Sequence, residues 1–343
     1  MSLAPVSHDM PMIRYALAFM ERLRSLSIHS LAIAAFSILA VASMSGCSVF
    51  SQAEGAASGE RADLGKMGAR PAARLHFAPR VGPEVELSLA MLAERCAPER
   101  IEVDDPYHEK RMRYAAIPLR CVLDFGFASQ GGAEGLREES LLLRALDGYT
   151  RPVSGQQLLE EGAYLAYGEP LRLAAIQSGA GETSASPPSA FSPIDRRQVD
   201  PAPFYMVWVG VQQNDPHAHP WPYQLSRIEI APFAAAFPRT EPKGLAEEDA
   251  GWAGYALFQN ACAACHSING EGGKIGPDLN VPRSIVEYRP VPQIRAYIRN
   301  PQATRYTSMP AHPELAESDL DALIAYFRAM SVRKDDPRKR SGS

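Results

Sequence analysis

The pentapeptide Cys262-Ala263-Ala264-Cys265-His266 constrains the fold of this chain more than any other feature. It has the pattern C-x-x-C-H, which is typical of covalent c-type haem attachment. Two thiols at this spacing near a helix end can each add across a haem vinyl group, and the histidine supplies one axial iron ligand. The sequence therefore predicts one covalent haem c, attached at Cys262 and Cys265 with His266 on the iron.

Two other uses of a C-x-x-C pair lack their sequence context. A thioredoxin-like dithiol belongs in a βαβ setting, which the flanking sequence does not have. A structural zinc site needs a second pair of ligands at suitable spacing, and none follows.

The length and composition describe an ordinary globular protein with room for two domains. The chain has 343 residues, of which 46% are hydrophobic and 22% are charged, so extensive disorder is not expected. The formal net charge is -4. This weak charge without a basic excess argues against nucleic acid as a partner.

The amino terminus has the features of an export signal. Residues 31–42 form an apolar run that follows Arg22 and Arg24, and the run is shorter than the ~20 residues that a membrane-spanning helix needs. A basic segment, a short apolar core and small residues describe a secretory signal peptide, here residues 1–46. An uncleaved anchor and an ordinary cleaved signal remain alternatives.

The end of this signal resembles a bacterial lipobox. Met44-Ser45-Gly46-Cys47 would make Cys47 the lipidated residue, and Ser48, which is not an aspartate, favours the outer membrane. The expected location is the periplasmic side of a bacterial membrane, held by a lipid anchor. Residues 47–73 are rich in Ala, Gly, Ser and charges, and we expect a flexible tether there.

Two cysteines remain after Cys47 and the haem motif are assigned. They are Cys96 and Cys121. In an exported chain a disulfide between them is a reasonable expectation, and two buried free thiols are the alternative. Sequence alone does not fix the distance between them.

Residues 74–238 have the alternation and β-forming residues of a domain with a sheet. We predict strands in segments 85–89, 100–103, 112–116, 204–211 and 223–230, a short helix from Ala90, and a long loop over 177–200. Segment 141–146 is apolar and ends at a turn signal, Asp147-Gly148.

This middle segment resembles the molybdopterin-binding domain of the sulfite oxidase type. The resemblance is carried by Ala145-Leu146-Asp147-Gly148-Tyr149, by Leu158-Leu159 and Leu165-Ala166, and by the strand from Tyr223 to Glu229. It implies a mixed α+β fold and, in the family, a cysteine thiolate on molybdenum. Neither Cys96 nor Cys121 aligns with that cysteine, so we expect the fold without the molybdenum cofactor.

Residues 241–330 resemble an all-α class I cytochrome c. The resemblance rests on Gly254 and Phe258 in a first helix over 249–261, on the haem motif, on a glycine-rich turn at 269–273, and on the aromatic pair Tyr326-Phe327. In the family, the glycine allows the first helix to cross the last one closely.

The same resemblance assigns the rest of the haem site. Gly276-Pro277-Asp278-Leu279 matches the segment in which the proline carbonyl accepts the Nδ1 hydrogen of the axial histidine, so Pro277 and Leu279 are expected to support the haem pocket. Ser308-Met309-Pro310 matches the distal loop, which makes Met309 the expected sixth ligand. His312 is the competing ligand.

Two features flank these motifs. The last helix is expected to begin with a capping box of Ser318 and Asp321, and residues 331–343 are expected to be a disordered tail. Arginines recur at positions 283, 289, 295, 299 and 305. They form either a solvated face or a surface for haem propionates or an acidic redox partner.

These observations predict an exported, membrane-anchored monohaem cytochrome that passes single electrons between redox proteins, with the middle domain as a docking module. With both axial positions filled, a carrier is favoured over a catalyst, and no catalytic residue is assigned. The alternative is a molybdenum-dependent oxidoreductase of the sulfite dehydrogenase type that passes electrons to its own haem.

Overall fold

The computed structural model describes residues 73–178, 189–194, 198–210, 215–216 and 218–340. The expected signal peptide, Cys47, nearly all of the expected tether and much of the expected loop over 177–200 lie outside these residues. None of the helices searched in the described part has both the length and the apolar character needed to cross a membrane. We call residues 73–238 the sheet region and residues 241–340 the helical region.

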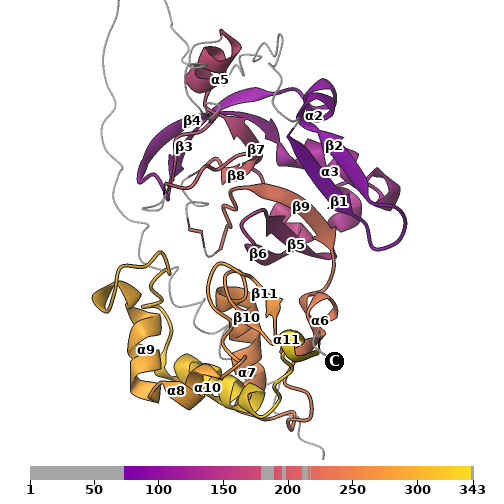
Figure 1. The fold of residues 1–343 in the computed structure, drawn as a ribbon. Helices are drawn as coiled ribbons and strands as arrows, with labels where there is room; N and C mark the ends of the chain where they lie inside the picture. Colours follow the sequence, from indigo (N-terminus) through magenta and orange to yellow (C-terminus); the bar gives the residue numbers. More distant parts are fainter. Residues whose placement is uncertain (1–72, 179–188, 195–197, 211–214, 217, 341–343) are drawn as a thin grey trace, which may run out of the picture. The chain divides into compact units, whose positions relative to one another are not determined.

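One sheet of the sheet region brings the first and last strands of that region together (Figure 1). In spatial order its strands are β2 (Val85–Ser88), β1 (Arg74–Ala78), β9 (Leu225–Ile230), β5 (Ser140–Ala145) and β6 (Thr150–Ser154). β1 and β9 run parallel, and the other neighbours are antiparallel. Pairing of strands so far apart in the chain closes the region as one unit.

The second sheet is antiparallel throughout. Its order is β3 (Glu99–Asp105), β4 (Lys110–Pro118), β7 (Ala163–Gly168) and β8 (Tyr205–Trp208). All four residues of β8 are buried, as expected for its aromatic and β-branched sequence.

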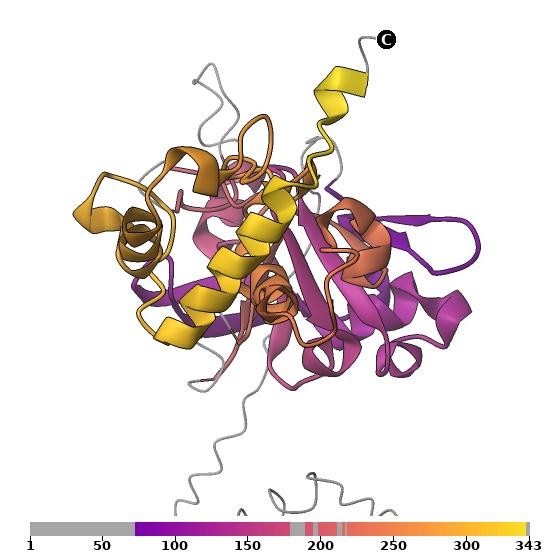
Figure 2. The same cartoon turned by 90° about the horizontal axis from the view of Figure 1, so that it is seen from below.

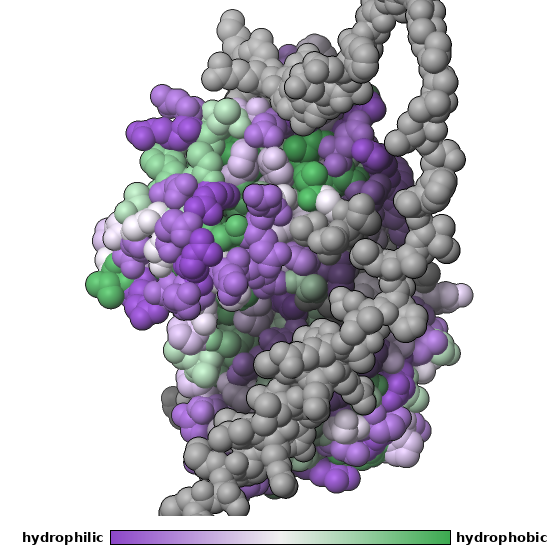
Figure 3. Space-filling model, turned by 180° about the vertical axis from the view of Figure 1, so that it is seen from behind, coloured by the Kyte–Doolittle hydropathy of each residue, from purple (hydrophilic) through white to green (hydrophobic). Residues whose placement is uncertain are grey.

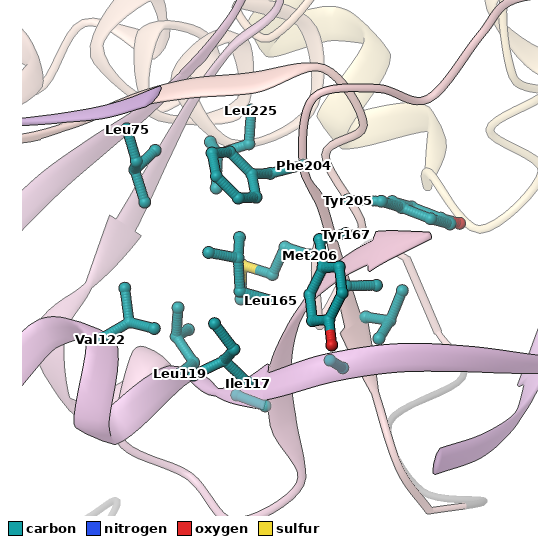
Figure 4. Packing of buried hydrophobic residues seen from close by; sticks show 14 of the residues in the cluster. Leu75, Ile117, Leu119, Val122, Leu165, Tyr167, Phe204, Tyr205, Met206 and Leu225 are labelled. Carbon is teal, nitrogen blue, oxygen red and sulfur yellow. The ribbon is translucent and has the colours of Figure 1, made fainter. Parts of the chain in front are cut away.

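Short helices complete the sheet region and supply part of its core. They are α2 (Leu89–Arg95), α3 (Leu119–Gly126), α4 (Gly155–Leu158), α5 (Pro170–Gln177) and α6 (Phe233–Ala236). Figure 4 shows Leu119 and Val122 of α3 facing the buried cluster that also contains Met206 and Phe204. The mixed α+β expectation for this segment therefore agrees with the structure.

A disulfide joins two of these helical segments. Cys96 follows the last residue of α2, and Cys121 lies in the first turn of α3. Their sulfur atoms are 2.05 Å apart.

The expected strands are present with shifted ends. The segment from Phe204 forms a strand only over Tyr205–Trp208, and the segment from Tyr223 begins its strand at Leu225. Gln224 has a positive φ of 54°, so the backbone turns there before the strand starts.

The helical region contains a long carboxy-terminal helix that crosses an earlier helix (Figure 2). Its helices are α7 (Ala250–Leu257), α8 (Ile285–Tyr288), α9 (Val291–Arg299), α10 (Glu317–Ser331) and α11 (Pro337–Arg340). Two short strands, β10 (Ser267–Ile268) and β11 (Glu271–Gly272), pair antiparallel. The region is therefore mainly helical, and the expectation of an all-α fold omits this pair.

A glycine sets the distance between α7 and α10. A Cβ atom on Gly254 would lie 2.0 Å from the Ala322 carbonyl oxygen and 2.7 Å from Tyr326 Cβ. On either side of this contact, the Tyr326 ring packs against Tyr255 and Phe258, with ring centroids 5.6 and 5.4 Å apart. Only a residue without a side chain permits this crossing.

The beginning of the last helix and the tail both differ from expectation. α10 begins at Glu317, and the Asp319 carboxylate accepts a hydrogen bond from the Ala316 amide at 2.8 Å. The expected capping box of Ser318 and Asp321 is therefore wrong, since Asp321 pairs with Arg295 instead.

Residues 331–340 are not the disordered segment that was expected. α10 continues to Ser331, and α11 follows. The Asp335 amide donates to Asn269 Oδ1 at 3.1 Å, and Lys334 pairs with Glu287. The charged residues of this tail therefore have hydrogen-bonding and ionic partners, which composition alone does not reveal.

The described surface is mostly polar on the face that Figure 3 shows, where apolar residues form separate patches. Large apolar side chains that are mainly exposed include Tyr306 and Leu171.

Candidate functional site

The C-x-x-C-H motif begins at the end of α7. The helix continues as a π-helical turn over Phe258–Cys262, in which the Ala263 amide bonds the Phe258 carbonyl at 2.8 Å. The amides of Cys265 and His266 then both bond the Cys262 carbonyl, at 3.1 and 2.9 Å. Single π-helical turns often occur at functional sites. Here the turn presents both thiols and the imidazole to one cavity.

A single hydrogen bond fixes the orientation of the His266 ring. Its Nδ1 atom lies 2.8 Å from the Pro277 carbonyl oxygen. A carbonyl can only accept, so Nδ1 carries the hydrogen and Nε2 keeps the lone pair that a metal would use.

The electrostatics of His266 also favour the neutral ring. Burial lowers the pKa of His266 below its usual value, although the Pro277 carbonyl and the Asp278 carboxylate act in the opposite direction. Neutral imidazole is the form that binds metals.

Two residues next to Pro277, Gly276 and Asp278, determine the position of the loop that carries it. A Cβ atom on Gly276 would lie 2.4 Å from His266 Cε1, so only glycine allows the chain to pass this close to the ring. The Asp278 carboxylate accepts from Ser267 Oγ at 2.9 Å and from the amides of Gly270, Asn280 and Val281 at 2.7, 2.8 and 2.8 Å. Sequence reasoning did not assign Asp278 a role, although its place directly after Pro277 could have suggested one.

The cavity walls are largely apolar. They include Leu279 beside the motif, and the residues Ile285, Ile294, Ile298 and Phe327 from α8, α9 and α10. Hydrophobic lining of this kind limits water and lowers the dielectric around a bound group.

Met309 and His312 both line this cavity, so the structure brings the expected ligand and its competitor to the same site. The Met309 amide donates to Thr307 Oγ1 at 3.1 Å, and its carbonyl accepts from Gln302 Nε2 at 3.0 Å. His312 is 4% exposed, and its Nδ1 lies 3.0 Å from Glu314 Oε1.

The residues at this cavity fit a covalently attached haem better than the other uses of paired cysteines. Burial, followed by the neighbouring Cys265, raises the pKa of the Cys262 thiol to about 12. A redox-active cysteine needs a stabilised thiolate, which this environment opposes. Across the described residues, no cluster of three or more His, Cys, Asp or Glu side chains could hold a metal ion.

The five arginines of this region have different surroundings. Arg295 and Arg299 pair with Glu317, and Arg283 donates to the Glu287 carbonyl. The guanidinium groups of Arg289 and Arg305 stack on the Tyr297 ring at 5.5 and 5.2 Å from its centroid. Both of these side chains line the cavity, so the five do not act as one surface.

The turn between β5 and β6 of the sheet region forms backbone hydrogen bonds with the C-x-x-C-H motif and the residues that follow it. The Thr150 amide donates to the Ala264 carbonyl, and the Lys274 amide donates to the Gly148 carbonyl, both at 3.0 Å. Gly148 has a φ of 93° and lies so close to Lys274 that a Cβ atom would be 2.9 Å from its Cβ. Sequence reasoning missed this contact, because nothing local connects residue 148 with the haem motif.

Two comparisons with known proteins each match a part of this chain. Residues 252–331 match the family model for cytochrome c. A segment of 81 residues is 35% identical to the cytochrome c oxidase subunit 2 of Alkalihalophilus pseudofirmus. This segment is 22% of the present chain and 23% of that relative. Residues 252–331 of this chain therefore match a cytochrome c domain, and the chain spans less than a quarter of the length of this relative.

Proposed function

We propose that this protein is an exported, membrane-anchored monohaem c-type cytochrome that transfers single electrons between redox partners. The observation that carries the proposal is the 2.8 Å contact between His266 Nδ1 and the Pro277 carbonyl, in the cavity that contains both motif cysteines. This contact leaves the Nε2 lone pair of His266 available for iron, in the same cavity as the two thiols that can attach the haem.

Haem c supplies a reversible one-electron change of iron. The chain contributes the surroundings: Cys262 and Cys265 would attach the haem, and His266 and Met309 would bind its iron. The apolar walls exclude water, and the thioether favours the reduced state relative to a second imidazole. Two protein ligands leave no position for a substrate, which favours electron transfer over catalysis at the iron.

The proposed location rests on two independent features. The segment before Cys47 has the composition of a lipoprotein signal. The disulfide between Cys96 and Cys121 suits an oxidising compartment such as the periplasm. Both features support export, and the first also supports a lipid anchor.

The proposed partners are redox proteins, and the sheet region is the proposed docking module. The similarity between an 81-residue segment of this chain and an oxidase subunit makes an oxidase a suitable partner class. The weak net charge of -4 supports a protein partner rather than nucleic acid.

The alternative, a molybdenum oxidoreductase, lacks its metal ligand in the described residues. That chemistry needs a free cysteine thiolate in the sheet region. Cys96 and Cys121 are joined to each other, and the free cysteines of the described chain are Cys262 and Cys265. The residues present do not fit the molybdenum group, so the carrier is the function we propose.

Metal analysis and redox titration of the purified full-length protein test the proposal. We expect one iron per chain, a c-type haem spectrum that persists after denaturation, and a one-electron titration curve. A Cys262→Ala and Cys265→Ala double variant is the control and should lose the covalent haem. One molybdenum per chain, or carbon monoxide binding to the ferrous haem of the folded protein, would contradict the carrier.

A further inference from the structure

A second cavity lies between the sheet region and the helical region. It has a volume of about 810 Å³, within the range of small-molecule sites. Tyr107, Tyr149 and Tyr223 line it from the sheet region, and Cys265 and Ser308 from the helical region. Cys265 and Ser308 also line the haem cavity, so the two cavities adjoin at the second haem-attachment residue.

The walls of this second cavity are aromatic and carry hydroxyl groups. The rings of Tyr107 and Tyr223 meet edge to face, with centroids 6.0 Å apart, and Trp221 adds another ring. Tyr107 lines the cavity and is 40% exposed. The surrounding protein nevertheless desolvates both phenols, so the pKa of Tyr107 and of Tyr149 lies above its ordinary value. These phenols remain protonated hydrogen-bond donors at physiological pH.

The charged side chains of the cavity have a net positive balance. Arg151 and Lys110 line it together with one carboxylate, that of Glu109. The Arg151 guanidinium also donates to the Asn260 carbonyl, which holds it at the boundary of the two regions. Nearby Asp105 accepts from the amides of Tyr107 and His108 and from Tyr114 Oη, at 2.8, 2.9 and 2.8 Å. Because Asp105 is occupied by these donors, the cations favour an anionic ligand group.

We propose that this cavity binds a hydroxylated aromatic acid beside Cys265. The ring of this ligand packs among the tyrosine and tryptophan side chains. The ligand hydroxyl forms hydrogen bonds with the phenols, and the ligand carboxylate lies near Arg151 and Lys110. A small oxyanion without a ring would leave the aromatic walls unfilled. The sheet region thereby gains a binding role that the proposed electron transfer does not require.

Calorimetric titration of the ferric holoprotein with 4-hydroxybenzoate tests the site. Saturable binding of one molecule per chain is expected. Tyr149→Phe and Arg151→Gln should each weaken it by about tenfold, or about 1.4 kcal/mol, because each variant removes one polar contact with the ligand. Tyr164→Phe and Arg113→Gln, which do not line the cavity, are the matched controls and should bind normally.

The outcomes separate this site from the proposed electron transfer, because calorimetry measures binding whether or not the haem changes oxidation state. The haem spectrum and thermal unfolding of each variant report whether it is folded, and Lys110→Gln replaces Arg151→Gln if the latter is unstable. Absence of saturable binding overturns the proposal. Equal binding by all variants overturns the location, and tighter binding of sulfite than of 4-hydroxybenzoate overturns the aromatic class.

Discussion

Met309 and His312 present two different ligand atoms to one cavity, and a single substitution distinguishes them. Met309→Ala removes the thioether but keeps the carbonyl that Gln302 holds. The expected result is loss of the weak sulfur-to-iron absorption band of the ferric protein. The reduction potential should also fall, by on the order of 0.1 V within the roughly 0.8 V that axial ligands span. Visible spectroscopy and redox titration measure both effects.

His312→Gln is the matched control, since it alters the competing side chain in the same cavity. It should keep the absorption band, with at most a small change in potential. Absence of the band from the unmodified protein, with a changed haem spectrum in His312→Gln and an unchanged one in Met309→Ala, would reverse the assignment.

His108 predicts a pH dependence of stability. Burial lowers its pKa below the usual 6.5, with Lys110 acting in the same direction and Asp105 and Glu169 opposing. Its Nε2 atom is buried and forms no hydrogen bond to a described residue. Between the lowered pKa and 6.5 the unfolded chain binds more protons, so stability falls as the pH drops through this window.

Urea unfolding of the holoprotein at pH 7.5 and 5.5 measures this contribution. His108→Gln should reduce the loss of unfolding free energy between these pH values, by at most ~1.4 kcal/mol per pH unit for one proton. His76→Gln is the control, because the His76 side chain is 41% exposed. An unchanged pH dependence in His108→Gln would show that another group is responsible.

At the scale of elements, helix propensity and packing favour different residues at Gly254, where α7 crosses α10. Alanine favours a helix over glycine by about 1 kcal/mol, yet the added methyl group at Gly254 would lie 2.0 Å from the Ala322 carbonyl oxygen. We expect Gly254→Ala to reduce the unfolding free energy by roughly 1–3 kcal/mol, because overpacking outweighs propensity.

Urea unfolding of the haem-loaded variant checks this expectation. Ala253→Ser in the same helix is the control, since Ala253 is exposed, and its effect should stay within about 0.5 kcal/mol. A neutral or stabilising Gly254→Ala would mean that the two helices can separate without cost.

The sequence predicts an element well when the residues that determine that element lie close together in the chain. The haem motif, Pro277 and Met309 lie within one domain with known spacing, so a resemblance places them. Alternation and β-forming residues likewise predict β2, β3, β4, β8 and β9, whereas β1, β6 and β7 were not predicted. The start of α10 is decided by Asp319 rather than by Ser318, and helix ends are set by such individual bonds.

At the scale of the whole described chain, the determinants are contacts between residues far apart in sequence. β1 pairs in parallel with β9, and Gly148 packs on Lys274. The Asn269 amide nitrogen donates to the carbonyls of Arg239 and Arg333, both at 3.0 Å, and so ties the region preceding α7 to the residues after α10. No local pattern reveals such pairs, which is why the second cavity could not be predicted from sequence.

β5 contacts both the sheet region and the helical region, and substitutions on its two faces test how the two regions depend on each other. Alternate residues of a strand point to opposite faces. Leu141 and Leu143 pack in the core of the sheet region, whereas Leu142 packs in the cluster of the helical region with Phe233 and Phe237. Both Leu142 and Leu143 are 0% exposed. Leu142→Ala and Leu143→Ala should therefore each cost about 2–5 kcal/mol of stability.

The two variants should differ in where the structure loosens. Hydrogen exchange measured by mass spectrometry should quicken in α6 and α7 for Leu142→Ala, and in β4 and β7 for Leu143→Ala, because each cavity removes contacts from a different cluster. If both variants loosen the same segments, the two clusters unfold as one cooperative unit. The sheet region would then stabilise the haem site as a whole, and not only through the turn between β5 and β6.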